Sequence, residues 1–423
     1  MLQLSYLREN REKAIELLAI KNFTRTDLID KVIRLDDKRR ETQKSLDENL
    51  SQANAMAKEI GMFFKTGKIE EAKLMKEKTT AFKKVSKELS EVLDQTSREL
   101  NKLLLEIPNI PHPSVPKGNR EEDNELIEEE GSKPELFASA LPHWDLAKKY
   151  DIIDFDLGSK VTGAGFPFYK GKGAKLQRAL INYFLDKALE AGYIEYQPPL
   201  FVNEASARGT GQLPDKEGQM YHITEDNLYP IPTAEVPITN IYRDQLLGFE
   251  DLPVKNAAYS NCFRREAGSY GKEVRGLNRL HQFDKVEIVQ IQHPEKSYDT
   301  LEEMRKHVSS LLRDLELPFR ILKLCGGDLG FTSAMTYDFE VYSAVQKKWL
   351  EVSSVSNFEN FQTNRMKLRF KDENGKNRLA HTLNGSALAL PRIVAALLEN
   401  NQTEKGIRIP KALIDYTKFE IID

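Results

Sequence analysis

The sequence predicts an α+β protein in which an antiparallel helical coiled-coil hairpin precedes an antiparallel β-sheet flanked by helices. Three observations support this class. Two long runs of helical periodicity fill most of the first hundred residues, a proline-rich stretch ends them, and short strand-like runs beyond residue 134 adjoin one another instead of alternating with helices. We therefore expect an N-terminal domain over 1–108, a linker over 109–133 and a larger domain over 134–423.

The N-terminal region is predicted to be a long hairpin. Apolar residues recur at three- and four-residue steps over residues 27–65 and again over 69–103. The sequence KTGK at 65–68 is typical of a turn, and two such helices joined by a tight turn form an antiparallel coiled coil. Nine lysines and four glutamates lie between Lys58 and Lys87, so this half of the hairpin is basic. It either binds a polyanion or is a solvated coiled coil without a ligand.

The linker and the larger domain differ from the hairpin in composition and in their predicted elements. Four prolines in IPNIPHPSVP (107–116) end the second helix, and the acidic stretch EEDNELIEEE (121–130) is expected to be a solvated loop. Beyond it, we expect a long helix that stops near Gly192 and leads into a strand. Further elements are predicted as a helix over 295–315, strands around 319–324 and 337–355, and an apolar helix over 384–401.

Composition places limits on the function. The net charge of -3 gives no global attraction to nucleic acid or membrane, although a local basic patch could still bind a polyanion. The two cysteines, Cys262 and Cys325, are far apart in the sequence, which indicates a reducing cytoplasmic compartment. No apolar run reaches about 18 residues and the first residues lack a signal-peptide core, so we expect no membrane association.

One stretch, CFRREAGSYGKEVRGLNRLHQFDKVEIV (262–289), concentrates the groups that carry chemistry. Side chains two apart share a strand face, so Arg264 and Glu266 are expected to point together, and so are the side chains of His281, Phe283, Lys285 and Glu287. An arginine fork suits a phosphate and a phenylalanine offers a flat surface to a purine. The glycine-rich loop between the strands could fold over a polyphosphate with Lys272, Arg275 and Arg279. The β-hairpin formed by these strands is thus either a binding site for a nucleoside triphosphate or only a charged surface.

The order of several motifs resembles a known family. The pattern Phe263-Arg264-x-Glu266 followed by Arg279-x-x-x-Phe283 resembles motif 2 of class II aminoacyl-tRNA synthetases. KALEAGYIEYQPPLFV resembles their motif 1, which forms the dimer interface in that class, and GSALALPR (385–392) resembles motif 3. More narrowly, TAE (233–235), EVSS (351–354), LNGSALALPR (383–392) and the N-terminal hairpin look like the seryl-tRNA synthetase family, over essentially the whole chain. Arg265 fills the variable place of motif 2, and Val352 replaces a more usual isoleucine.

The resemblance implies a function and a set of site residues. It implies ATP-dependent activation of L-serine to seryl-adenylate, transfer of serine to the 3′ end of tRNA(Ser), a class II synthetase sheet, a homodimer, Mg²⁺ bound with ATP, and tRNA(Sec) as a possible further partner. The implied catalytic residues are Arg264 and Arg392. The implied ATP-binding residues are Arg264, Arg265, Glu266, Phe283, Glu351, Val352, Ser353, Ser354 and Arg392, with Glu351 and Ser354 as Mg²⁺ ligands. The implied serine-binding residues are Thr233, Ala234, Glu235, Glu287, Asn384 and Ser386.

Chemistry and family suggest individual roles. Attack of the serine carboxylate on the α-phosphate needs positioning and charge neutralisation more than a general base. Arg264 would bridge that carboxylate and the α-phosphate, Glu266 would hold the adenine amino group and Phe283 would stack on the ring. Arg392 would lie on the other face of the base or near the γ-phosphate. Either glutamate of the serine pocket could take the ammonium or the hydroxyl.

Other interpretations remain open at this point. Arg264 and Glu266 could be a surface strand pair, Glu351 could keep an edge strand soluble, and Thr233 could simply cap a helix. Class II synthetases for threonine, proline, glycine or histidine usually carry a further domain after motif 3, whereas about 23 residues follow Asn400. A catalytically inactive relative and a coiled-coil RNA-binding or scaffold protein are the alternatives outside the enzyme class.

Overall fold

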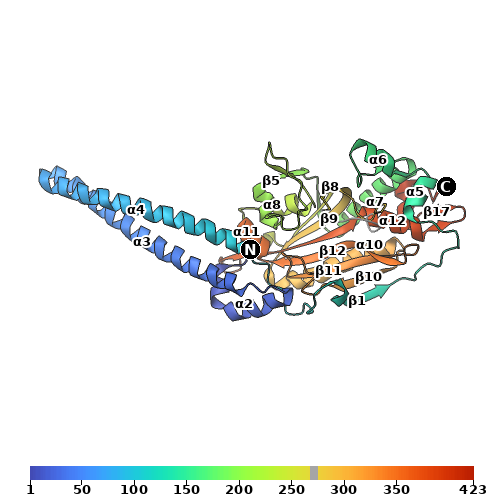
Figure 1. Cartoon of the computed structure of the whole chain (residues 1–423), viewed down its shortest axis with the longest axis horizontal. Helices are drawn as coiled ribbons and strands as arrows, with labels where there is room; N and C mark the ends of the chain where they lie inside the picture. Colours follow the sequence, from blue (N-terminus) through green and yellow to red (C-terminus); the bar gives the residue numbers. More distant parts are fainter. Residues whose placement is uncertain (267–274) are drawn as a thin grey trace. The chain divides into compact units, whose positions relative to one another are not determined.

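A helical hairpin and a sheet-based domain are the two units of the chain (Figure 1). The computed structural model describes residues 1–266 and 275–423. Unit 1 consists of residues 1–19 and 23–108, and unit 2 consists of residues 20–22 and 109–423. Both parts of the predicted α+β class are therefore present. None of the helices in the described ranges is long and apolar enough to cross a membrane.

Unit 1 contains the predicted antiparallel hairpin, preceded by two short helices. Its helices are α1 (Leu4–Glu9), α2 (Arg11–Leu18), α3 (Thr26–Lys65) and α4 (Ile69–Leu104). The turn lies at the predicted KTGK, where Gly67 has a φ of +75°, a value that favours glycine. Leu28 and Val32 are buried near the start of α3, whereas Met62 and Leu74 near the turn are exposed. The apolar seam is thus well covered at the base and open at the tip.

Polar contacts fix how the helices of unit 1 pair. Asn49 of α3 donates hydrogen bonds to the Phe82 carbonyl at 2.8 Å and to the Ser86 hydroxyl at 2.7 Å, both on α4. A polar residue at such an interface specifies the register at some cost in stability. Near the base, the carboxylate of Asp36 is fully buried and forms an ion pair with Arg8 of α1 at 2.9 Å. The short helix α1 is thereby tied to α3.

The core of unit 2 is one eight-stranded sheet. Every neighbouring pair is antiparallel except β4 and β8, which are parallel. In spatial order the strands are β1 (Glu125–Glu130), β10 (Phe319–Lys323), β11 (Met335–Ser343), β12 (Lys348–Glu359), β15 (His381–Ala389), β9 (Gln282–Gln292), β8 (Val254–Phe263) and β4 (Ile194–Tyr196).

Helices and small sheets surround this sheet. The helices are α5 (His143–Lys149), α6 (Phe155–Val161), α7 (Gly171–Glu190), α8 (Glu204–Thr210), α9 (Glu235–Asn240), α10 (Ser297–Asp314), α11 (Phe361–Met366), α12 (Leu390–Asn400) and α13 (Lys411–Thr417). The remaining strands are β2 (Ile153–Asp154), β3 (Phe168–Tyr169), β5 (Phe201–Asn203), β6 (Leu228–Pro230), β7 (Leu246–Leu247), β13 (Arg369–Lys371), β14 (Asn377–Leu379), β16 (Gln402–Thr403), β17 (Gly406–Arg408) and β18 (Ile421–Ile422).

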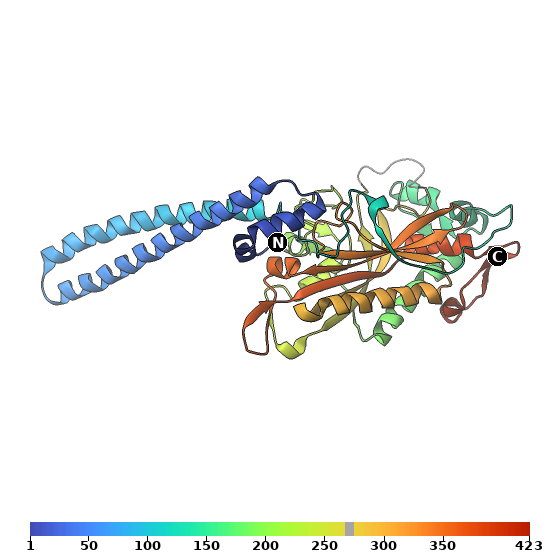
Figure 2. The same ribbon diagram turned by 90° about the horizontal axis from the view of Figure 1, so that it is seen from below.

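The two faces of the sheet have different environments. Helix α10 lies along one face and contacts β12 and β15 (Figure 2). A Cβ added to Gly385 of β15 would lie 3.0 Å from Val355 and 3.5 Å from Met304 of α10, so the strand and the helix pack tightly at the glycine. Because side chains alternate along a strand, Asn384 and Ser386 point to the opposite face. That face is therefore free of α10 and available for a site.

The acidic stretch 121–130 was expected to be a solvated loop, and this expectation is wrong for its second half. Residues 125–130 form β1, which pairs with β10 at the edge of the sheet. Arg313 of α10 contacts Glu130 at 2.8 Å, and Arg305 of α10 contacts Glu128 at 2.8 Å. The arginines of α10 compensate the charges of the glutamates. Because α10 is far away in the sequence, the local charge pattern of 121–130 could not predict these ion pairs.

The predicted helix over 384–401 is half wrong. Residues 381–389 form the central strand β15, and helix α12 begins only at Leu390, with Pro391 in its first turn. All residues of β15 except Ala389 are buried, so both faces of the strand are covered and no alternation of buried and exposed residues marks it. Periodicity alone cannot separate such a strand from a buried helix. The predictions for α7, α10, β10, β11 and β12 agree with the structure within a few residues.

Candidate active site

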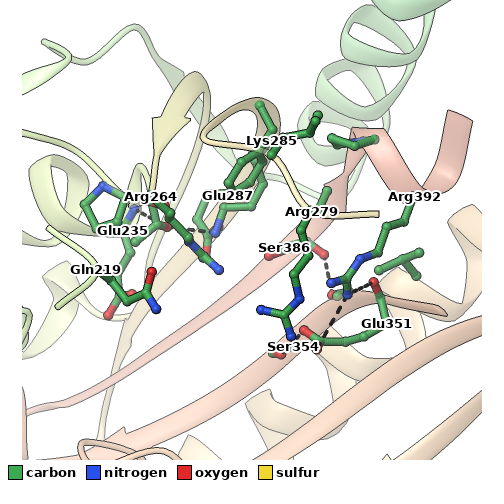
Figure 3. Close-up of a pocket in the computed structure, with 18 of the residues that line it drawn as sticks. Gln219, Glu235, Arg264, Arg279, Lys285, Glu287, Glu351, Ser354, Ser386 and Arg392 are labelled. Atoms are coloured by element: carbon green, nitrogen blue, oxygen red, sulfur yellow. Dashed lines mark hydrogen bonds and ion pairs between the residues drawn. The ribbon is translucent and has the colours of Figure 1, made fainter. Parts of the chain in front are cut away.

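A cavity of about 510 Å³ opens on the sheet face that carries Asn384 and Ser386 (Figure 3). Its walls come from the ends of β8 and β9, from β12 and β15, and from the start of α12. The residues of the predicted site that line it are Thr233, Glu235, Arg264, Glu266, Phe283, Glu287, Glu351, Val352, Ser353, Ser354, Asn384, Ser386 and Arg392. The structure therefore gathers residues that are up to about 160 positions apart in the sequence.

One part of the cavity contains two buried carboxylates and one buried ammonium. Glu235 at the start of α9 is 7% exposed, and Glu287 of β9 is 2% exposed. Lys285, two residues before Glu287 on the same strand face, lies 2.5 Å from the Glu287 carboxylate. Lys285 also donates a hydrogen bond to the Thr233 hydroxyl at 2.8 Å. The lysine thus provides a counter-charge and orients Thr233.

The environment of Glu235 shifts the pKa of its carboxylate. Burial, and to a smaller extent the charge of Glu287, raise the pKa of Glu235 to about 7. A hydrogen bond from the Gln362 amide at 2.6 Å and the charge of Lys285 oppose this effect. Glu235 consequently changes its charge near neutral pH, and a cation that enters the pocket would favour its ionised form.

Two of the residues that hold Glu235 in place, Gln362 and Thr382, were not predicted from the sequence. Gln362 of α11 accepts a hydrogen bond from the Thr382 hydroxyl at 2.7 Å, which fixes the amide orientation that donates to Glu235. No motif marked Gln362 or Thr382. Lys285 was predicted on the correct strand face but received no role; its place two residues before Glu287 was the available signal.

A second group surrounds the end of β8. The strand ends at Phe263, so Arg264 and Glu266 reach the cavity from the loop beyond it and not by strand alternation. The Arg264 guanidinium lies 5.2 Å from the centre of the Phe283 ring. Glu266 has a φ of +47° and forms an ion pair with Arg279 at 3.1 Å. A cation for phosphate and a flat aromatic surface therefore lie side by side.

A third group lies across the cavity, at β12 and α12 (Figure 3). The Ser354 hydroxyl donates to the Glu351 carboxylate at 3.3 Å, and Arg392 donates to the Glu351 carbonyl at 2.8 Å. Asp338 of β11 pairs with Ser354 in the strand register, and among the described residues no hydrogen-bond partner meets its buried Oδ1 atom. Burial and then the nearby charge of Glu351 raise the pKa of Asp338. These clustered oxygens have the donor chemistry that a hard divalent cation prefers.

Some predicted residues lie elsewhere. Ala234 is fully buried and packs with an apolar cluster behind the cavity, and the Arg265 side chain is exposed outside the cavity lining. His281 stacks on Phe166 with ring centres 5.4 Å apart and lines a neighbouring cavity instead. Lys272 lies outside the described residues.

Comparisons with known proteins agree with this geometry. The family model for the seryl-tRNA synthetase N-terminal domain matches residues 1–111, and the model for the tRNA synthetase class II core domain (G, H, P, S and T) matches residues 220–401. A serine–tRNA ligase of Salinibacter ruber is 51% identical to the chain over 99% of its length and 98% of the relative. One from Methylacidiphilum infernorum is 45% identical over the full length of both.

The chain belongs to the seryl-tRNA synthetase family. A crystal structure of seryl-tRNA synthetase from Pyrococcus horikoshii complexed with ATP matches the fold with a TM-score of 0.91 and 33% identity, covering 100% of this chain and 99% of that one. A prolyl-tRNA synthetase from Giardia lamblia, at 14% identity and a TM-score of 0.56, shares the fold over 64% of the chain. In this seryl-tRNA synthetase family member, the segment resembling motif 1 is α7 with β4, that resembling motif 2 is β8 with β9, and that resembling motif 3 is β15 with α12.

The buried charges predict a pH-dependent loss of stability when Lys285 is replaced. Lys285→Met leaves Glu235 and Glu287 in one pocket without their buried ammonium partner, and removing one partner of a buried pair costs about 3–5 kcal/mol. The pKa of Glu235 then rises above 7, so its ionised form is costly at pH 8 and largely absent at pH 5.5. The deficit in the free energy of unfolding, measured by urea titration, should be larger at pH 8 than at pH 5.5.

A double variant provides the matched control. Lys285→Met combined with Glu287→Gln removes the cation and one carboxylate together, so it should recover most of the stability at pH 8. An equal deficit at both pH values, or no recovery in the double variant, would contradict a buried electrostatic cluster.

Proposed function

We propose that this chain activates L-serine with ATP to give seryl-adenylate, and then transfers serine to the 3′ end of tRNA(Ser). The observation that carries the proposal is the juxtaposition in one cavity of a buried carboxylate pair and an arginine beside an aromatic ring. The carboxylates suit the ammonium and hydroxyl of serine. The arginine and the aromatic ring suit the phosphates and the base of a nucleotide. The named relatives are serine–tRNA ligases, and the Pyrococcus structure is complexed with ATP.

The serine end is assigned to Thr233, Glu235, Glu287, Asn384 and Ser386, with Ala234 in the supporting backbone. A pocket whose buried polar groups pair with a substrate hydroxyl rejects analogues without it, because those groups are then left unpaired. Lys285 supports this assignment, since it neutralises one carboxylate and leaves the other to face the serine ammonium. When Glu235 is ionised, the charges of these three side chains balance only if an ammonium is bound.

The ATP end is assigned to Arg264, Arg265, Glu266, Phe283, Glu351, Val352, Ser353, Ser354 and Arg392. Arg264 would bridge the serine carboxylate and the α-phosphate, where negative charge develops during attack and pyrophosphate leaves. Phe283 would stack on adenine and Glu266 would accept from its amino group. Arg392 would contact the base or the γ-phosphate. Fixed cations at these places stabilise the transition state without a general base.

Mg²⁺ is proposed as the cation bound with ATP. Glu351 and Ser354 would hold it, and the buried Oδ1 of Asp338 beside Ser354, which has no hydrogen-bond partner in the described ranges 1–266 and 275–423, supports an additional positive charge there. Bound Mg²⁺ would neutralise charge on the phosphate oxygens. The protein's own part is to hold these oxygens in place through the β11–β12 register.

Residues 1–108 are assigned to tRNA binding, 109–133 to a linker and 134–423 to catalysis. The support for tRNA binding is the basic half of the hairpin, with nine lysines between Lys58 and Lys87. Lysine contacts to phosphates give affinity with little base information, so shape would carry the recognition. We extend this to tRNA(Sec) as a further possible substrate, through the resemblance alone.

A homodimer is proposed from the exposed edge of the sheet. Strand β4 pairs with β8 on one side, and its Ile194 is 62% exposed, with Phe201 nearby in sequence 47% exposed. Apolar residues on an edge strand favour a protein interface over solvent. The mass measured by sedimentation in solution tests this. A cytoplasmic location is inferred from the paucity of cysteine and the requirement for tRNA.

The direct test of function is ATP–pyrophosphate exchange with each of the twenty amino acids. Exchange should occur with serine. In a folded Arg264→Ala variant it should fall by about 10²–10³, the usual cost of losing one donor at a developing charge. Arg208→Ala, at an exposed position of helix α8 and outside the cavity lining, is the matched control and should retain exchange. Exchange with another amino acid alone would overturn the serine assignment, and an Arg264→Ala rate near wild type would overturn the role of Arg264.

The second test separates the hairpin from the catalytic unit. Residues 45–88 are replaced by a short Gly/Ser linker, which removes all nine lysines but keeps the ion pairs of Asp30 and Asp36 at the base. Serine-dependent exchange should persist, because the cavity lies entirely in unit 2. Charging of tRNA should collapse, and the steep loss of tRNA affinity with salt should largely disappear.

A charge-only variant controls for the loss of shape. Lys65, Lys68, Lys73 and Lys76 are replaced by Gln in the full-length hairpin. The salt slope of tRNA binding should fall by about one for each phosphate contact removed. Normal charging by the truncated chain would contradict tRNA binding by the hairpin.

A further inference from the structure

A fully buried histidine lies outside the cavity but adjoins its wall. His143, the first residue of α5, has no exposed surface, and neither does Glu399 of α12. The His143 Nδ1 atom lies 2.7 Å from the Glu399 carboxylate, which also accepts the His143 backbone N–H at 3.0 Å. None of the motifs and none of the proposed substrate contacts involves either residue.

Further donors complete the environment of Glu399. The Ser343 hydroxyl donates to one carboxylate oxygen and the Gln346 amide donates to the other at 3.0 Å. A buried carboxylate is normally stabilised by a cation or by several hydrogen bonds. Here the hydrogen bonds of His143, Ser343 and Gln346 satisfy Glu399, so the carboxylate is a fixed acceptor that orients the imidazole.

The opposite nitrogen of the ring holds the backbone of the loop that returns into β9. The Leu277 N–H donates to His143 Nε2 at 2.9 Å. Because Nε2 accepts, the ring hydrogen must be on Nδ1, which faces Glu399. Gly276 permits this approach: it has a φ of +69°, and a Cβ there would lie 2.2 Å from Nε2.

The same short segment reaches the cavity. The carbonyl of Asn278 accepts a hydrogen bond from Arg392 Nε at 2.9 Å, and the Asn278 amide donates to Gln346 at 3.2 Å. Arg279, the next residue, pairs with Glu266. Leu277, Asn278 and Arg279 all line the cavity. The imidazole of His143 therefore fixes a backbone segment that carries the side chain of Arg279 and holds the side chain of Arg392 by a hydrogen bond.

We propose that His143 is a positioning residue for ATP use, which holds the 276–279 segment so that Arg279 and Arg392 face the nucleotide. This inference rests on the proposed function, because ATP binding at Arg392 is part of that proposal. The residues assigned to serine lie just before and at the start of α9, on β9 and on β15, and none of them belongs to the 276–279 segment. Loss of His143 should therefore affect ATP use more than serine use.

Two variants separate the two hydrogen bonds of the ring. The amide of Gln reaches about as far as Nε2, so His143→Gln keeps an acceptor for the Leu277 N–H. The amide of Asn reaches only about as far as Nδ1, so His143→Asn keeps a donor for Glu399 but leaves the Leu277 N–H unpaired in a buried place. An unpaired buried donor has a cost equivalent to about a tenfold change or more in an equilibrium constant.

The measurements are KM for ATP, KM for serine and kcat in exchange, together with the thermal midpoint. His143→Asn should raise KM for ATP about tenfold or more while KM for serine stays within about twofold. His143→Gln should retain ATP use. A purely structural role would lower the thermal midpoint and change both KM values together. Equal ATP parameters in His143→Asn and wild type, or equal losses in both variants, would overturn the inference.

Direct ATP binding gives a second readout. Trp144 is one of two tryptophans; its ring centre lies 4.8 Å from that of His143, and Arg275 lies 4.7 Å from it. In a Trp349→Phe background, Trp144 fluorescence should report ATP binding that weakens in His143→Asn.

If His143→Asn does not fold, Gly276→Ala displaces the ring from the loop side and must produce the same ATP-selective defect. Absence of exchange in wild type would instead refute the proposed function.

Discussion

The pairing of Lys285 with Glu287 is the interaction on which the rest of the site depends. Two carboxylates and one ammonium are almost completely removed from solvent, and burial of a single uncompensated charge there would be very costly. The lysine compensates one carboxylate and fixes Thr233, while Glu235 keeps a raised pKa near 7. The pocket is therefore one positive charge short at the pH at which Glu235 ionises, and it is suited to a ligand that brings an ammonium.

The antiparallel sheet makes this arrangement possible. Alternate residues of β12, β9 and β15 divide the sheet into a face covered by α10 and a face that carries the cavity. Gly385 and Val355 lie on the face packed against α10, whereas the residues next to them in each strand point to the cavity. The same strands lead directly into α12 and into the 276–279 segment, so the nucleotide contacts and the serine pocket are built on one rigid element.

Local patterns were sufficient for the hairpin and for one strand face of the cavity, whereas most other residues that line the cavity were implied only by the resemblance to the family. The helical period, the KTGK turn and the spacing of Phe283, Lys285 and Glu287 all depend on neighbours in sequence. The failures depend on distant partners. Arg305 and Arg313 convert an acidic loop into β1, and burial on both faces hides the strand character of β15. Gln362, Thr382 and His143 carried no local signal, because their roles come from contacts with residues far away in the chain.

The most direct measurement of the central claim is proton release on serine binding. Titration calorimetry at pH 7 in buffers with different ionisation enthalpies gives the number of protons exchanged. Since Glu235 is partly protonated near pH 7 and a bound ammonium favours its ionised form, serine binding should release protons, and the release should vanish well above pH 8 and in Glu235→Gln. Serine binding with no buffer dependence at pH 7, or with proton uptake, would contradict the account.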